Sequence, residues 1–564
     1  MRKAWVVLLA GLALILGGAY LASRIQTSGG IKVDDVRFAG ADGVLMSGLL
    51  YTPKTATPDK PAPGILAVHG YINSRETQAG FAIEFARRGY VVLAMDQTGH
   101  GYSGGAAFSQ GFGGPAGLSY LRSLPMVDKA NIGLEGHSMG GWTVLAAAAA
   151  MPDAYKAIVL EGSSTGAPFA AEGSPTWPRN LGLVFSQYDE FSKIMWNVDR
   201  AKDVTSSEKL KAVFGTTQTI VPGRIYGQIA NGTARRLSTP ATTHPGDHFS
   251  PEAIGYSLDW FAKTLTGGTP LPANNQIWIW KEVGTGIGLI GFVLLLLGTF
   301  DVLLGLAVFA GLNRAAIGTH PVRDGGWWRR FWIMALVPIV TYFPAFMLVT
   351  LFMKPSSLLP QTISNQVLVW ALINTAITLG LGLVDRRRAG QFDNRWGLSV
   401  LISLLTVGIG YAVVAATAKV FTTDLRFWVL ALKPFSAAQL QIAPVYLVGL
   451  TVFFLVALKA LHEQLAIRGD APINRYVAAI GAMALGFALL LGLDYGVFFV
   501  TGSLPTRFDP LSTVVAMQFL PLMAMVAVIS VFTWRRTHSY VPGALICALF
   551  VTWYLVAGTA TQVV

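Results

Sequence analysis

Residues 134–142 read LEGHSMGGW and place Ser138 between Gly136 and Gly140, with Gly141 next in the chain. A serine hydroxyl becomes a nucleophile when a strained turn exposes it and a neighbouring base removes its proton. Glycines on either side remove side chains that would collide in such a turn. An apolar run precedes the serine and the Ala-rich run WTVLAAAAA follows it, which predicts a strand-to-helix junction. The pattern therefore predicts a serine that attacks a carbonyl carbon.

Two main-chain N–H groups are expected to receive the negative charge that this attack creates. Met139 would be the first residue of the helix after Ser138, and a helix N-terminus favours negative charge. Tyr71 ends the apolar stretch GILAVHGY and is the expected second donor. A base must also come from elsewhere in the chain, and His244 and His248 lie just before a predicted closing helix.

Short β-rich runs alternate with helical stretches from about residue 28 to 272, which predicts a mostly parallel sheet covered on both faces. Ligands of such sheets bind at the carboxyl ends of the strands. Residues 163–210 are long enough to form a small lid. The expected strands are IKVDDVRFA, VLMSGLLYT, GILAVHG, YVVLAMD, NIGLEGH, AIVLEG, KAVFGT and ARRLSTPA.

HGY at 69–71, GHSMG at 136–140 and the late histidines, in this order, resemble the α/β-hydrolase superfamily over about residues 30–265. The resemblance implies an α/β-hydrolase fold with an eight-stranded, mostly parallel sheet. It also implies a catalytic triad in the chain order serine, acid, histidine, and no metal or organic cofactor. PATTH, which ends at His244, occupies the place of the family's Pro-Gly-Ala-Gly-His. That favours His244 and leaves His248 as the alternative.

The acid departs from the family pattern, because Gln218 stands where an aspartate is expected after the predicted strand KAVFGT. An amide cannot stabilise an imidazolium as a carboxylate does. Glu161, at the end of the strand AIVLEG, is the tentative acid. Asp247, an acid from the lid such as Asp189, or no acid at all remain open.

The rest of the chain is predicted to lie in a membrane, since 53% of the 564 residues are hydrophobic and 13% are charged. We expect three parts: a transmembrane anchor at 1–27, the hydrolase domain at 28–272 and a polytopic region at 273–564. An alternative for residues 1–22 is a cleaved signal peptide. Eight runs in the third part have spanning length. They lie at about 285–311, 331–353, 366–384, 398–418, 440–460, 476–500, 513–533 and 541–560, while the stretch 424–439 is too short to cross and is expected to be re-entrant or interfacial.

Basic residues gather in alternate loops between these runs. Residues 28–272 carry 20 Lys+Arg and 20 Asp+Glu, so the net charge of +12 does not indicate a nucleic-acid partner. The positive-inside rule then puts the N-terminus in the cytoplasm and the hydrolase domain on the extracytoplasmic face of the plasma (inner) membrane. The loops on the N-terminal side contain Arg314, Arg323, Arg329, Arg330, Arg386, Arg387, Arg388, Arg395, Arg468, Arg475, Arg535 and Arg536.

Together these features predict a membrane-embedded serine hydrolase that cleaves hydrophobic or lipid-like carboxylic esters among membrane lipids. The alternatives are an acyltransferase with the same acyl-serine, a peptidase, and a transporter or receptor whose hydrolase-like domain only binds. Asp301 and Asp494 are candidate functional residues because charged groups inside membrane spans are costly. The sequence leaves the oligomeric state open.

Overall fold

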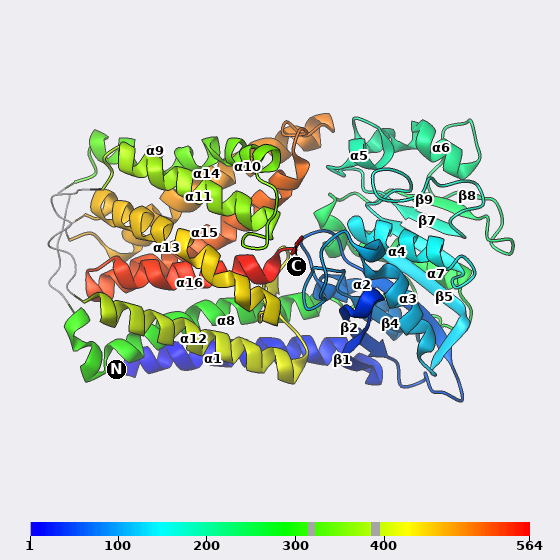
Figure 1. The fold of residues 1–564 in the computed structure, drawn as a ribbon, viewed down its shortest axis with the longest axis horizontal. Coiled ribbons are helices and arrows are strands. Elements are labelled where there is room, and N and C mark those ends of the chain that lie inside the picture. The colour runs from blue at the N-terminus through cyan, green and yellow to red at the C-terminus, as the bar shows by residue number, and fades with distance from the viewer. Residues whose placement is uncertain (1, 314–321, 385–394, 468, 564) are drawn as a thin grey trace. The chain divides into compact units, whose positions relative to one another are not determined.

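The structure is a computed structural model that describes residues 2–313, 322–384, 395–467 and 469–563. The chain forms two compact units, a sheet unit and a helical unit (Figure 1). The sheet unit comprises Leu21–Val283, Tyr495–Pro510 and Gly558–Val564, and the helical unit comprises Met1–Tyr20, Gly284–Asp494 and Leu511–Ala557. Two late segments thus fold with the sheet, whereas the sequence boundary at 273 assigns them to the membrane region.

Nine strands form the sheet, in the order β1-β2-β4-β3-β5-β6-β7-β9-β8. The six strands from β4 to β9 in this order pair in parallel, and β1, β2 and β8 pair antiparallel at the edges. The mostly parallel sheet that the sequence predicts is therefore present. The strands are β1 (Lys32–Ala39), β2 (Leu45–Thr52), β3 (Ala62–Val68), β4 (Val91–Met95), β5 (Val127–His137), β6 (Ala157–Glu161), β7 (Leu181–Val184), β8 (Ile225–Tyr226) and β9 (Arg235–Ser238).

Apolar side chains on both faces of the sheet explain why the central strands read as continuous hydrophobic runs. Leu66 and Leu93 lie in one buried cluster with residues of α3 and α4, and Ile65 and Val92 lie in the other with residues of α2 and α7. Successive residues point to opposite faces, so each strand supplies both clusters. The covering helices are α2 (Ala79–Arg87), α3 (Gly114–Ser123), α4 (Met139–Ala150) and α7 (Pro251–Thr264).

One predicted strand is a helix, and one strand of the sheet was not predicted. KAVFGT belongs to helix α6 (Glu208–Phe214), and the strand that pairs between β6 and β9 is instead β7, LGLV. Residues 208–214 begin with Ser207 as the N-cap, whose side chain accepts from Leu210 N, so local capping favours the helix. The predicted lid at 163–210 consequently includes a strand of the sheet.

Within the described residues, nine helical segments are long and apolar enough to cross a membrane, and each predicted run overlaps one of them. Helices α9 and α10 count as one such segment. Of the basic loop residues, Arg314, Arg386, Arg387, Arg388 and Arg468 lie outside the described residues. The helices are α1 (Arg2–Gln26), α8 (Ile279–Leu304), α9 (Gly325–Val340), α10 (Tyr342–Phe352), α11 (Thr362–Gly380), α12 (Trp396–Phe421), α13 (Ala437–Leu465), α14 (Pro472–Thr501), α15 (Pro510–Thr537) and α16 (Val541–Gly558).

Glycines bring the backbones of α1 and α8 into contact within the helical unit. A Cβ added to Gly11 would lie 2.4 Å from Leu295 N, and one added to Gly18 would lie 2.3 Å from Gly284 O. Small residues allow this close approach of helices. Helix α1 therefore packs as a member of the helical unit.

The structure gives a local explanation for two features of the helical unit, the stretch 424–439 and Asp301. The stretch predicted to be re-entrant or interfacial forms the hairpin β10 (Leu425–Phe427) and β11 (Leu430–Leu432) before α13 begins. Asp301 pairs with Arg536, whose Nη2 lies 2.7 Å from Asp301 Oδ2. An ion pair between two helices accounts for this aspartate without a functional role.

Candidate active site

Ser138 lies in a strained turn between β5 and α4. Its backbone has φ 55° and ψ −122°, a conformation that non-glycine residues rarely adopt. A Cβ on Gly136 would lie 2.2 Å from Gly140 O, and a Cβ on Gly140 would lie 2.1 Å from Val68 O. The flanking glycines are therefore required by close backbone contacts, as the sequence predicts. The turn presents a half-buried serine at the carboxyl end of β5.

Parallel pairing of β7 with β9 continues beyond both strands and brings two loops together. Phe185 N donates to Ser238 O over 2.9 Å, Gln187 N to Pro240 O over 2.9 Å, and Tyr188 N to Thr242 O over 3.1 Å. The residues that follow on the two loops are Asp189 and His244. The sheet register thus sets an aspartate beside a histidine.

Asp189 and His244 form a direct side-chain contact of 2.8 Å between Oδ2 and Nδ1. The other carboxylate oxygen, Oδ1, accepts from Phe191 N over 2.8 Å, which fixes the orientation of the carboxylate. The ring of Phe191 packs on the His244 imidazole at 4.5 Å between centroids. Both partners are buried, so water competes little for this contact.

His137 precedes Ser138 in the chain, and its side chain contacts His244. The centroids of the His137 and His244 rings are 4.6 Å apart, and His137 Nε2 lies 2.9 Å from His244 O. A Cβ on Gly70 would lie 3.1 Å from Ser138 Cβ and 3.2 Å from His137 Nδ1. The serine turn, the β3 end and the histidine loop therefore meet at one edge of the sheet.

Burial dominates the electrostatics of the pair. It lowers the pKa of His244 to about 4, against an opposing effect of the Asp247 charge. Burial and then Asp247 raise the pKa of Asp189 well above its ordinary value, and the Phe191 N–H lowers it. The imidazole is consequently neutral at neutral pH, which is the form that can accept a proton.

Glu161, the tentative acid expected from the sequence, is engaged elsewhere. Its carboxylate accepts a hydrogen bond from Ser257 Oγ, on helix α7, and burial followed by Asp247 raises its pKa well above the ordinary value. Asp247 in turn accepts from Ser186 Oγ and lies 3.6 Å from His137 Nε2. The structure thus replaces Glu161 by Asp189, one of the open alternatives, as the carboxylate on His244.

His248, the alternative base, lies one turn beyond His244. Its ring stands edge-on to Phe81 at 6.0 Å and lies 4.2 Å from the His137 ring. Gln218 is exposed after α6, away from the β7 end. LGLV is not among the strands expected from the sequence, so the sequence did not place the loop with Asp189 after a strand of the sheet.

The two expected oxyanion donors occupy different elements. Met139 is the first residue of α4, where a main-chain N–H has no acceptor within the helix. Tyr71 follows β3, and its hydroxyl accepts from Gln562 Nε2 over 3.0 Å. The adjacent Thr561 exchanges hydrogen bonds with the 99–107 loop, from its N to Gly99 O and to its O from Ala107 N, each 2.8 Å. C-terminal residues thus brace the Tyr71 side of the site.

An aromatic cluster lies beside the nucleophile turn. Phe169 stacks on Phe108 at 5.7 Å and contacts Trp142, one turn along α4 from Ser138, at 5.0 Å. Phe108 also lies 5.5 Å from the ring of Tyr71. Phe169 is 46% exposed and Phe108 is 38% exposed, so the cluster offers apolar surface next to the site.

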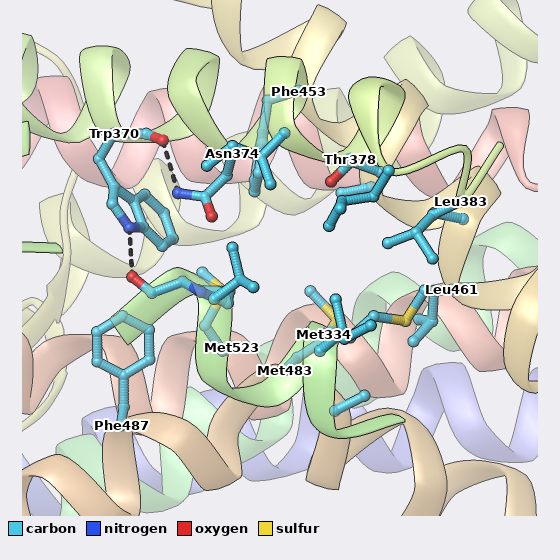
Figure 2. A pocket seen from close by; sticks show the side chains of 18 residues that line it. Met334, Trp370, Asn374, Thr378, Leu383, Phe453, Leu461, Met483, Phe487 and Met523 are labelled. Carbon is cyan, nitrogen blue, oxygen red and sulfur yellow. Dashed lines mark hydrogen bonds between the residues drawn. The ribbon is translucent and has the colours of Figure 1, made fainter. Parts of the chain in front are cut away.

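A cavity of about 90 Å³ lies inside the helical unit (Figure 2). Met334, Met483 and Met523 line it together with Trp370 and Asn374. Asn374 Nδ2 donates to Trp370 O over 2.8 Å. The cavity is smaller than the roughly 150 Å³ of an engineered protein cavity that holds benzene.

A family profile described as serine aminopeptidase S33 matches residues 59–190, from the residues before β3 through Asp189. That segment contains Tyr71, the Ser138 turn and the loop with Asp189 after β7, which we call the acid loop. Its strands belong to the sheet described above. The sheet unit is an α/β-hydrolase domain. A monoacylglycerol lipase of Mycolicibacterium smegmatis is 32% identical over 138 residues, which are 23% of this chain and 46% of the lipase. The hydrolase domain is similar to this lipase over that segment, which spans about half of the lipase's length.

Solved structures align with the hydrolase domain. An esterase of Pyrococcus furiosus is 22% identical, with 42% of this chain and 94% of the esterase covered and a TM-score of 0.30. An acylaminoacyl peptidase of Pyrococcus horikoshii is 16% identical, with 42% of each chain covered and a TM-score of 0.30.

Proposed function

We propose that this chain is a membrane-embedded serine hydrolase that cleaves carboxylic esters with apolar acyl groups through an acyl-serine at Ser138. The observation that carries the proposal is the 2.8 Å contact between Asp189 and His244 on the loop next to the strained Ser138 turn. A nucleophile, a base and a carboxylate that orients the base are the three parts of a serine hydrolase site.

In the proposed reaction, Asp189 holds the His244 Nδ1 proton, so Nε2 accepts the proton of Ser138 Oγ as this oxygen attacks the ester carbonyl. The main-chain N–H groups of Tyr71 and Met139 receive the charge on the carbonyl oxygen, each contributing roughly 10²–10³-fold in rate. The ester C–O bond then breaks, and the proton passes from Nε2 to the departing alcohol. Water attacks the acyl-serine in the same way and releases the acid.

The aromatic cluster supports an apolar acyl group. Phe169 and Phe108 present exposed rings beside α4, and burying one large apolar side chain against a ligand contributes about 1.5–3 kcal/mol. The similarity to a monoacylglycerol lipase points in the same direction. We infer a substrate with a long acyl chain, presented from the lipids around the helical unit.

The nine apolar helices support a location in the membrane, and the distribution of basic loops supports an extracytoplasmic hydrolase domain. Cysteine labelling tests this topology, since the native Cys547 is buried. We expect a membrane-impermeant maleimide to label Asp59→Cys on intact cells and Asn474→Cys only after lysis. Both positions are exposed. The reverse pattern would place the hydrolase domain in the cytoplasm.

A fluorophosphonate probe tests the activated serine. The full-length protein should be labelled, and Ser138→Ala should not be. A transporter or receptor that only binds would remain unlabelled. Labelling together with acyl transfer to an added alcohol in preference to water would favour the acyltransferase, and cleavage of amides in preference to esters would favour the peptidase.

Chain-length preference tests the acyl site. Phe169→Ala should raise KM for a p-nitrophenyl palmitate about ten-fold and leave p-nitrophenyl acetate unchanged, because the ring offers 46% of its surface to a long chain. Phe508→Ala, which removes a ring that is 60% exposed elsewhere in the hydrolase domain, is the matched control. Equal effects on the two esters would argue against an acyl site at this cluster.

A further inference from the structure

Glu190, the residue after Asp189, bonds the catalytic histidine loop through the main chain. Its Oε2 accepts from His244 N over 2.8 Å. Its Oε1 accepts from Tyr495 Oη over 2.6 Å. Glu190 is 7% exposed, so its two oxygens are engaged in a protein environment rather than in water. One carboxyl group thus joins His244 to a tyrosine that lies 305 residues after Glu190 in the sequence.

Tyr495 belongs to the last turns of α14, and residues 495–510 fold with the sheet unit. The same helix end holds the acid loop at a second point. The ring of Phe499 meets the ring of Tyr188 edge-on at 5.0 Å, and Phe498 does so at 6.1 Å. The acid loop is therefore held on one side by β9 and on the other by residues 495–499.

We propose that Tyr495 and Glu190 are positioning residues that set His244 and Asp189 for proton transfer with Ser138. The hydrogen bond to His244 N fixes the backbone from which the imidazole projects, and the Tyr495 hydroxyl fixes Glu190. This inference rests on the proposed function. It adds a segment that lies about 300 residues beyond the matched family region, at residues 59–190, to the parts that the reaction needs.

The protonation of Glu190 indicates which substitution preserves the bridge. Burial, and then the neighbouring Asp189, raise the pKa of Glu190 to about 8. In the protonated form of this carboxyl group Oε2 still accepts from His244 N, and the hydrogen bond to Tyr495 reverses its direction, so that Oε1 donates to the hydroxyl oxygen of Tyr495. A glutamine has the same shape, one acceptor and one donor group. Glu190→Gln should therefore keep both contacts, whereas Glu190→Ala removes both.

The full-length variants are tested in two assays. Fluorophosphonate labelling gives the maximal labelling rate and the half-saturating probe concentration, and ester turnover gives kcat and KM. Glu190→Ala should lower the maximal rate and kcat about 10- to 100-fold, since a displacement of about 1 Å at a catalytic group costs on that order. Tyr495→Phe should lower them about 3- to 10-fold, the effect of one net hydrogen bond. KM should stay within two-fold in both, and Glu190→Gln should stay within three-fold of wild type at pH 7.

Tyr256→Phe is the matched control, because Tyr256 Oη also donates to a carboxylate, Glu252 Oε1, over 2.8 Å, but on the exposed side of α7. It should leave kcat unchanged. Unchanged kcat in Tyr495→Phe, a rise confined to KM, or a loss in Glu190→Gln as large as in Glu190→Ala would overturn the inference. If wild type itself is neither labelled nor active, the proposed function fails instead, so the two failures are distinct.

Discussion

Replacing Asp189 by asparagine gives the sharpest test of the site, because the surrounding hydrogen bonds dictate how the amide must lie. Asp189 Oδ1 accepts from Phe191 N over 2.8 Å, and Oδ2 faces His244 Nδ1 at 2.8 Å. The asparagine oxygen must take the Phe191 N–H, since the opposite orientation sets two donors against each other. Its NH₂ group then faces Nδ1 and forces the imidazole proton onto Nε2.

An imidazole in that tautomer cannot accept the proton of Ser138, so the base is lost although the geometry is kept. Turning the amide over leaves a buried N–H unpaired, which costs about 1–3 kcal/mol, and removes the charge that stabilises the imidazolium. We expect kcat of Asp189→Asn to fall about 10³- to 10⁴-fold, comparable to the same substitution in serine proteases. KM should change little, because the carboxylate does not contact substrate in the proposed mechanism.

The assay is hydrolysis of a p-nitrophenyl ester by full-length protein, together with the rate of fluorophosphonate labelling. Glu161→Gln is the control, since Glu161 bonds Ser257 instead of His244, and it should keep kcat within ten-fold. An active Asp189→Asn combined with an inactive Glu161→Gln would refute the assignment and restore the acid expected from the sequence.

Three further outcomes follow from the same geometry. The pKa of His244, lowered to about 4 by burial, means that the imidazole is neutral above that pH, so the acid limb of kcat/KM should lie below pH 5; a limb near 6.5 would contradict it. Gly140→Ala puts a Cβ 2.1 Å from Val68 O, which should lower the thermal unfolding midpoint by about 5–10 °C in differential scanning fluorimetry; an unchanged midpoint would show that the backbone can yield. Gln562→Ala removes the 3.0 Å hydrogen bond to Tyr71 and should lower kcat about five-fold at constant KM, as measured by steady-state kinetics; no change would show that the C-terminal brace is dispensable.

Much of this architecture can be predicted from the sequence because it depends on local patterns. Alternating β-rich and helical runs indicate the mostly parallel sheet, and hydrophobic runs of spanning length match the nine apolar helical segments. The glycines around Ser138 indicate the strained turn, because a side chain at Gly136 or Gly140 would meet backbone atoms at 2.2 Å or less. Such signals lie within a few residues of what they specify.

The carboxylate beside His244 could not be assigned in this way, because strand register decides which side chain lies next to this histidine. LGLV has only four residues, and it forms a strand because it pairs with β6 and β9. KAVFGT is apolar enough for a strand, but the residues before it include a cap that begins a helix. Only the continued pairing of the β7 and β9 ends sets Asp189 against His244. Only tertiary contact brings Tyr495 to Glu190, because residues this far apart in the sequence share no local sequence pattern. The amino-acid sequence by itself determined the strained turn at Ser138 and the class of fold. The tertiary structure decided which carboxylate contacts His244, because that choice depends on contacts between distant segments.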